Sequence, residues 1–191
     1  MRESDYMREF KAAAWPMSLK VVSCIGSLLV CGVSIGAIRA IPPVGGFTQQ
    51  FGTGVACVPP SIIIFCLLFV VRAYSISGGH LAIRRLFWST TIPILGIHEA
   101  CHDPLAIKGS LRIWGNGGLF GITGYYWNKK LGRFRLFATD PAKAVVMRLH
   151  DRIVVISPEE PEAFIQELDR FFPRLKEPHE PGATEIKVSP S

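Results

Sequence analysis

The sequence predicts an α+β protein in which a two-helix transmembrane hairpin precedes an antiparallel β-barrel or sandwich of about seven strands, capped by a C-terminal helix. Three observations predict this architecture. Two apolar runs without any charge lie near the N-terminus, at Val21–Ile38 and Val55–Val71. Short β-like segments follow Arg72 with no long helix between them, and one amphipathic helical pattern follows the last of these segments.

The two apolar runs are long enough to cross a membrane. They contain 18 and 17 residues, and at 1.5 Å per residue each forms a helix of about 25–27 Å, close to the thickness of a bilayer's hydrocarbon core. Core helices of a soluble protein are the alternative, but Lys20, Arg39 and Arg72 bracket the runs as basic residues bracket membrane spans. Pro59 and Pro60 predict a kink in the second span.

The charges beside the spans predict the orientation of the chain. Lys and Arg are frequent in residues 1–20 and after the second span, whereas the connecting segment Arg39–Gly54 contains only Arg39. The positive-inside rule therefore predicts that both termini are cytoplasmic. Residues 1–20 are expected to form a cytoplasmic segment, and residues 21–71 the transmembrane hairpin. Four of the five cysteines lie in this hairpin, so we expect neither a disulfide framework nor a cysteine metal site.

A second domain is predicted from residue 72 to residue 173. Short apolar runs between glycine-rich or polar turns predict strands. These runs are Tyr74–Ile76, Leu81–Phe87, Ile92–Ile97, Tyr125–Asn128, Phe134–Ala138, Ala144–Leu149 and Ile153–Ile156. Because the connections are short, we expect an antiparallel sheet that closes or packs on itself.

A single helix is predicted at the end of this domain. Ser157 is expected as its N-cap, with Pro158 in the first turn. One apolar stripe follows, made of Phe164, Ile165, Leu168, Phe171 and Phe172. The stripe predicts that the helix packs on the sheet and plugs one of its ends. Residues 174–191 are polar and proline-containing, which predicts a disordered tail.

Three segments resemble the bacterial pleckstrin-homology (PH-like) domain proteins. They are Tyr74–Phe87 with its Gly-Gly turn, Arg112–Gly124 (RIWGNGGLFGITG) continuing to Ala138, and Arg152–Phe164 (RIVVISPEEPEAF). The resemblance implies a PH-like fold behind a two-helix anchor in a bacterial inner membrane. It implies no reaction and supplies no set of ligand-binding residues. We therefore expect a non-catalytic interaction module without a cofactor.

The segment His98–His102 matches HExxH, the motif of zinc peptidases. That chemistry needs His98 and His102 on one helical face as metal ligands, with Glu99 as the base. The run before His98 favours a strand, on which the two histidines would lie about 13 Å apart, too far to share one metal. A membrane zinc peptidase is therefore the alternative function, and a surface strand is the preferred interpretation.

The glycine-rich stretch Gly115–Gly118 could in principle cradle a phosphate. Such a cradle opens a helix, whereas the residues that follow this stretch have β character. We therefore expect a sharp turn or a bulge with positive φ angles.

The remaining functional signal is positive charge. Nine basic and only two acidic residues lie between Lys108 and Arg152. Four of them cluster at one predicted hairpin beside Trp127: Lys129, Lys130, Arg133 and Arg135. Basic and aromatic residues together suit anionic lipid headgroups, or else a protein partner. Nucleic acid is not expected to bind, because the chain is anchored in a membrane.

Overall fold

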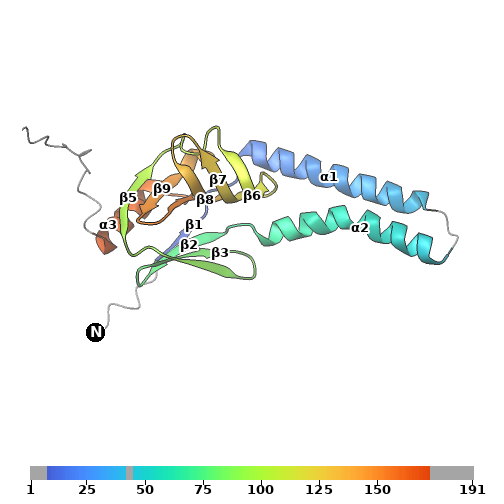
Figure 1. Cartoon of the computed structure of the whole chain (residues 1–191), viewed down its shortest axis with the longest axis horizontal. Helices are drawn as coiled ribbons and strands as arrows, with labels where there is room; N and C mark the ends of the chain where they lie inside the picture. Colours follow the sequence, from blue (N-terminus) through green and yellow to red (C-terminus); the bar gives the residue numbers. More distant parts are fainter. Residues whose placement is uncertain (1–7, 42–44, 173–191) are drawn as a thin grey trace, which may run out of the picture.

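The computed structural model of the chain describes residues 8–41 and 45–172. Two helices, α1 (Met17–Ala40) and α2 (Phe47–Leu68), form the expected hairpin and project side by side from a domain rich in strands (Figure 1). Both are long and apolar enough to cross a membrane, and only 11% and 6% of their most apolar stretches are buried within the protein. Helices so apolar and so exposed are typical of membrane spans and not of a soluble core. α2 continues through Pro59 and Pro60 as one helix.

The first sheet is antiparallel and has the strand order β1-β2-β3-β4. Its strands are β1 (Arg8–Lys11), β2 (Ala73–Ser77), β3 (His80–Arg84) and β4 (Ser89–Pro93). β1 precedes the helical hairpin in the sequence, whereas the other three strands follow it. Arg8 pairs with Ile76 and Lys11 with Ala73. The domain is therefore assembled from chain on both sides of the hairpin.

Strand β1 is absent from the sequence-based prediction, which treated residues 1–20 as a segment outside the domain. The physical reason is the shortness of the strand. It contains four residues, of which only Phe10 is buried. So short a segment gives no alternating pattern that could be told from a solvated tail.

The second sheet has six strands in the order β5-β9-β10-β8-β7-β6. Its strands are β5 (Ile97–His102), β6 (Leu111–Gly117), β7 (Ile122–Asn128), β8 (Gly132–Ala138), β9 (Val145–Leu149) and β10 (Ile153–Ile156). β8 and β10 pair in parallel, with Val154 opposite Arg135. This pairing corrects the expectation of a purely antiparallel sheet: the β9–β10 hairpin folds back so that β10 lies between β9 and β8.

The run Ile92–Ile97 was predicted as one strand, and this was wrong, because β4 ends at Pro93 and β5 begins at Ile97. β6 was not among the predicted strands, although it extends through Gly117. The positive φ angles expected in the glycine-rich stretch are confirmed at Gly115 and Gly118, with values of 121° and 125°. A bulge lies just before this stretch, where the register shifts between Arg112 and Trp114.

The two sheets pack as an open sandwich, and they do not close into a barrel. One core cluster lies between the sheets and includes Tyr74, Ile83, Phe137 and Met147. A second cluster lies on the outer face of the six-stranded sheet, where Ala106 from the segment between β5 and β6 packs over it. Both clusters contain side chains from β8, because its residues alternate between the two faces.

Helix α3 (Pro161–Phe171) completes the inter-sheet core. Phe164 and Leu168 are fully buried, as the apolar stripe predicts, and the Phe164 ring packs edge-on against Phe10 at 5.1 Å. The predicted N-cap was wrong, because the helix begins at Pro161 and the buried Ser157 hydroxyl instead accepts a 2.8 Å hydrogen bond from the backbone N–H of Thr139.

Tyr74 fastens the two sheets together. Its hydroxyl donates a 2.6 Å hydrogen bond to the backbone oxygen of Phe137 and accepts one of 3.2 Å from the backbone N–H of Ser157. Burial raises the pKa of Tyr74 to about 12, although the hydrogen bond from Ser157 opposes the shift. The phenol therefore stays protonated at physiological pH and can keep donating to Phe137.

Candidate interaction surfaces

The pairing of β1 with β2 fixes where the domain sits relative to the hairpin. β1 ends at Lys11, six residues before α1 begins, and β2 begins five residues after α2 ends at Leu68. Backbone hydrogen bonds tie these two connections, since the N–H of Ala12 donates to the oxygen of Arg72 at 2.9 Å. If α1 and α2 crossed the membrane in the same direction, the whole bilayer would separate β1 from β2. The pairing therefore requires that α1 and α2 run in opposite directions.

A basic pocket opens where α2 joins the first sheet. It has a volume of about 650 Å³. Its lining contains four basic side chains and one acidic side chain: Lys11, Arg72, Arg84, Arg85 and Glu9. Arg84 forms a 2.6 Å ion pair with Glu9, and no described residue forms an ion pair with the other three basic side chains. We call these four basic residues the basal cluster.

Aromatic side chains flank the basal cluster. Phe87 and Trp88, in the turn between β3 and β4, line the same pocket, and Phe87 is 75% exposed. The Trp88 ring packs edge-on against Phe69, the residue that caps α2, with centroids 5.1 Å apart. Basic and aromatic side chains that follow directly after a span are typical of the membrane–water interface.

Arg85 reaches from the basal cluster toward the space between the sheets. Its guanidinium carbon lies 5.4 Å from the Phe69 ring centroid and 5.5 Å from that of Phe137, a ring that Arg135 also approaches to 5.2 Å. Burial, together with the positive charge of Arg135, lowers the pKa of Arg85. The Arg85 Nε atom is buried without a hydrogen-bond partner in the described part of the chain. Two neighbouring cations without a carboxylate create a local preference for an anion.

The four basic residues predicted from the sequence do not form one patch. Arg133 and Arg135 alternate with buried residues on β8 and share a face with Tyr125 and Trp127 of β7, their partners in register. Lys130 instead forms an ion pair with Asp103, and this hydrogen bond lowers the pKa of the Asp103 carboxyl.

The turn lysines, Lys129 and Lys130, also lie at a different position along the strand direction from Arg133 and Arg135. Lys129 and Lys130 are in the turn that follows β7, whereas the other end of β7 adjoins the turn that contacts α1. A strand of seven residues spans about 20–25 Å. The turn lysines are therefore about that far from the contact with α1, measured along the strand.

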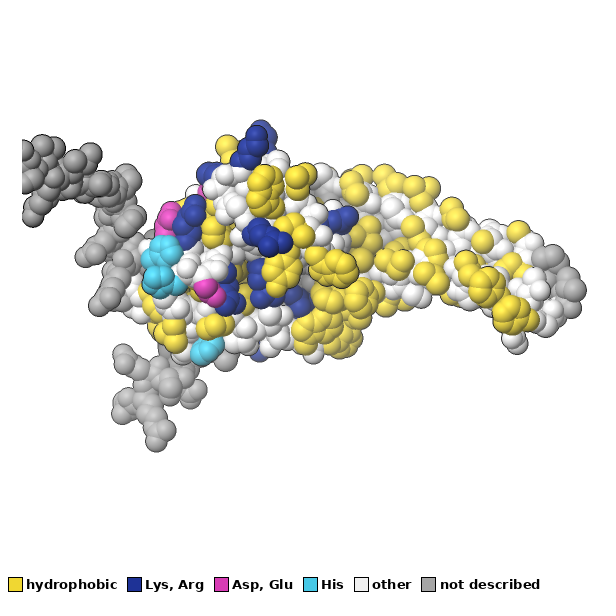
Figure 2. Space-filling model, in the orientation of Figure 1, with side chains coloured by type: hydrophobic (Ala, Val, Ile, Leu, Met, Phe, Trp, Pro, Cys, Tyr) yellow, Lys and Arg dark blue, Asp and Glu magenta, His cyan; other side chains and the backbone are white. Residues whose placement is uncertain are grey.

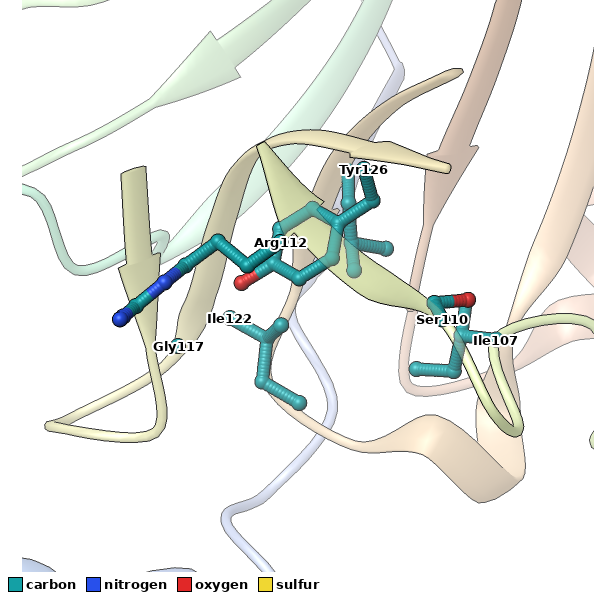
Figure 3. Close-up of a pocket in the computed structure, with 7 residues that line it drawn as sticks. Ile107, Ser110, Arg112, Gly117, Ile122 and Tyr126 are labelled. Carbon is teal, nitrogen blue, oxygen red and sulfur yellow. The ribbon is translucent and has the colours of Figure 1, made fainter. Parts of the chain in front are cut away.

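Two further pockets lie on the six-stranded sheet. One, of about 540 Å³, adjoins Arg133 and Arg135 and is lined also by Trp114, Tyr125 and Arg152. The other, of about 360 Å³, lies at the β6–β7 hairpin, where Figure 3 shows the Arg112 and Tyr126 side chains beside each other. Arg112 is the only charged side chain that lines this second pocket. The positive charge available to a ligand is therefore greater in the first pocket and in the basal cluster.

The HExxH segment forms β5, so the predicted strand conformation is confirmed. Each of its three motif side chains has a separate neighbour. The His98 ring lies 6.1 Å from the ring of His150, Glu99 forms a 2.9 Å ion pair with Arg148, and the Nδ1 atom of His102 lies 3.0 Å from a carboxylate oxygen of Glu162. Within residues 8–41 and 45–172, no group of three or more His, Cys, Asp or Glu side chains could hold a metal ion. The geometry gives no support to the zinc-peptidase alternative.

Comparison with known proteins gives one match. The model of a family described as "Bacterial PH domain" matches residues 72–171, just over half of the chain. No curated protein and no solved structure matches the chain. The matched region begins immediately after the second span and ends at the last residue of α3. β1 lies outside it, although this strand is paired within the same sheet.

Proposed function

Because the chain belongs to the bacterial PH domain family, we propose that it is a non-catalytic interaction module anchored in the inner membrane of a bacterium. Both termini lie in the cytoplasm, and the module binds anionic lipid headgroups at the surface in which it is anchored. The ligand site is the basal cluster.

One observation carries this proposal: the basal cluster opens directly at the end of the second span. Arg72 is separated from Leu68, the last residue of α2, by only three residues. Its neighbours in the pocket are brought there by the pairing of β1 with β2 and of β2 with β3. A basic residue near an anionic surface contributes about 1 kcal/mol to binding. Three basic side chains without an ion-pair partner among the described residues therefore favour an anionic membrane over a neutral one by about 3 kcal/mol.

The surface predicted from the sequence supports a second candidate, a protein partner. Arg133 and Arg135 lie beside Trp127 and Tyr125, next to a pocket. Arg133 pairs with Trp127 near the end of β7 that lies away from α1, so this residue is better placed for a partner in the cytoplasm than for the headgroups. An acidic protein surface is the complementary ligand.

A comparison of two charge-neutralising variants tests these assignments. The full-length protein is reconstituted in nanodiscs of neutral lipid and in nanodiscs that contain anionic lipid, and thermal unfolding of the domain is measured in each. We expect the wild type to be more stable with anionic lipid, because a ligand that binds the folded state stabilises it. Lys11→Gln, Arg72→Gln and Arg85→Gln combined should remove most of this difference, because these are the three basic residues without an ion-pair partner among the described residues. Salt should also reduce it, since charges are screened beyond about 8–10 Å.

The matched control neutralises three other basic residues with Lys129→Gln, Lys130→Gln and Arg133→Gln, and it spares Arg135, which approaches the same Phe137 ring as Arg85. This variant removes as much charge as the first, yet we expect it to keep the difference between the two kinds of nanodisc. If the control loses the difference and the basal-cluster variant keeps it, the lipid site is at the hairpin and the proposal is wrong. If the wild type shows no difference at low salt, lipid binding at either surface is rejected.

A further inference from the structure

The turn between β6 and β7 rests on the first span. The backbone N–H of Phe120 donates a 3.1 Å hydrogen bond to the hydroxyl of Ser23 in α1. A Leu119 methyl group lies 3.7 Å from the position that a Cβ atom would take on Gly26. The Phe120 ring also lies 5.8 Å from the ring of Trp15, just before α1. These contacts belong to residues 118–121, which we call the hairpin tip.

The residues of α1 that contact the hairpin tip belong to the apolar part of the span. Lys20 is the last charged residue before the apolar part of α1, and Ser23 and Gly26 follow it by three and six residues. At 1.5 Å per residue they lie about 4.5 Å and about 9 Å further along the span. The charge-free run that begins at Val21 is only just long enough to cross the hydrocarbon core. α1 therefore cannot slide far along the membrane normal, and its first apolar turns stay within the bilayer.

Most of the backbone N–H groups of the hairpin tip have hydrogen-bond partners within the protein. The N–H of Leu119 donates to the side-chain oxygen of Asn116 at 3.3 Å, and the Asn116 amide donates to the backbone oxygen of Leu119. The N–H of Gly118 donates to the oxygen of Gly121 at 3.1 Å. Together with the bond from Phe120 to Ser23, these bonds give partners to three of the four N–H groups and to two of the four backbone oxygens of the tip. A turn within lipid depends on such internal partners more than a turn in water does.

The side chains of the hairpin tip itself are apolar, although the Arg112 guanidinium reaches the adjoining Gly117 (Figure 3). Leu119 and Phe120 occupy the tip itself, and the exposed β3–β4 turn carries Leu86, Phe87 and Trp88 beside α2. Figure 2 shows hydrophobic side chains that continue from the helices onto the adjoining part of the domain.

We propose that the hairpin tip is inserted into the lipid, at the boundary between headgroups and acyl chains, and that its partner there is the acyl chains themselves. The tip holds the domain against α1, so that the basal cluster keeps a fixed height above the membrane. Insertion rests on the contacts with α1 and is independent of whether the lipid is anionic.

Single-tryptophan variants of the full chain test this proposal. The native residues Trp15, Trp88, Trp114 and Trp127 are replaced by Phe, and one tryptophan is introduced at the tip by Leu119→Trp or, in a second variant, by Phe120→Trp. Each protein is reconstituted in neutral vesicles whose lipids are brominated near the headgroup end of the acyl chain. We expect bromine to quench most of the tip emission, which should also be blue-shifted.

The control is Lys129→Trp in the same background, at the other end of β7. It should keep its emission and show the red-shifted spectrum of a residue in water. If both tip variants are quenched no more than this control, the tip is not in lipid and the proposal is overturned. Blue-shifted emission without quenching also overturns it, because protein and not lipid then covers the tip.

Discussion

Replacing Phe164 or Leu168 with aspartate is expected to unfold the domain. Both side chains are fully buried on α3 in the core between the sheets. Placing a carboxylate there without a partner costs several kcal/mol, and the apolar contacts of the original side chain are lost as well. The total approaches the whole stability of a typical domain, about 5–15 kcal/mol. Thermal unfolding of the full-length protein in detergent, followed by tryptophan fluorescence, should lose its cooperative transition.

The matched control is Gln166→Asp, on the exposed face of the same helix. It adds the same charge to α3 and should change the melting temperature little, because surface substitutions are usually within about 0.5 kcal/mol. A wild-type transition in Phe164→Asp or Leu168→Asp would show that α3 does not pack on the sheets as described.

The second large effect is expected from Arg8→Gln. Arg8 on β1 forms a 2.5 Å ion pair with Glu167, a carboxylate that is only 2% exposed, and Arg170 lies 3.4 Å from the same oxygen. Removing Arg8 leaves the buried carboxylate with Arg170 as its remaining partner, and removing one hydrogen-bond partner of a buried polar group typically costs about 1–3 kcal/mol. Adding Glu167→Gln to Arg8→Gln should recover part of this loss. Chemical denaturation of the single and double variants measures both quantities.

The comparison variant for this pair is Arg84→Gln. It breaks the ion pair of Arg84 with Glu9, in which both side chains are about half exposed. Exposed pairs contribute about 0–1 kcal/mol, so a small effect is expected. If Arg8→Gln is no more destabilising than Arg84→Gln, β1 does not contribute to the domain through Glu167. The result matters for any experiment on an isolated soluble fragment, since a chain that begins at residue 72 lacks β1.

Much of the fold could be predicted because its signals are local. The spans follow from uninterrupted apolar runs, and the position of α3 follows from the spacing of Phe164 and Leu168. The strand at His98–His102 could be predicted from the apolar run that precedes it and from the prolines nearby in the sequence. β1 and the parallel pairing of β8 with β10 could not be predicted in this way. They depend on which segments meet in three dimensions, and Arg8 and Ile76 are separated by the entire hairpin.

The candidate site shows the same limit more strongly. The sequence analysis joined Lys129, Lys130, Arg133 and Arg135 because they are close in the chain, but strand alternation and the ion pair of Lys130 separate them. The basal cluster combines Lys11 with Arg72, Arg84 and Arg85, and no local pattern connects these positions. The positive-inside rule counts the charges before α1 and the charges after α2 separately. Only the pairing of β1 with β2 shows that they form one surface.

We infer that both flanks of the helical hairpin lie on the cytoplasmic side, where β1 and β2 build one sheet. A topology reporter fused after Ser191 and a second one inserted at Gly46, between the two helices, test it most directly. We expect the reporter at Ser191 to be active only in the cytoplasm and the one at Gly46 only outside it. A reporter at Ser191 that is active in the periplasm, or two reporters active on the same side, would contradict the account.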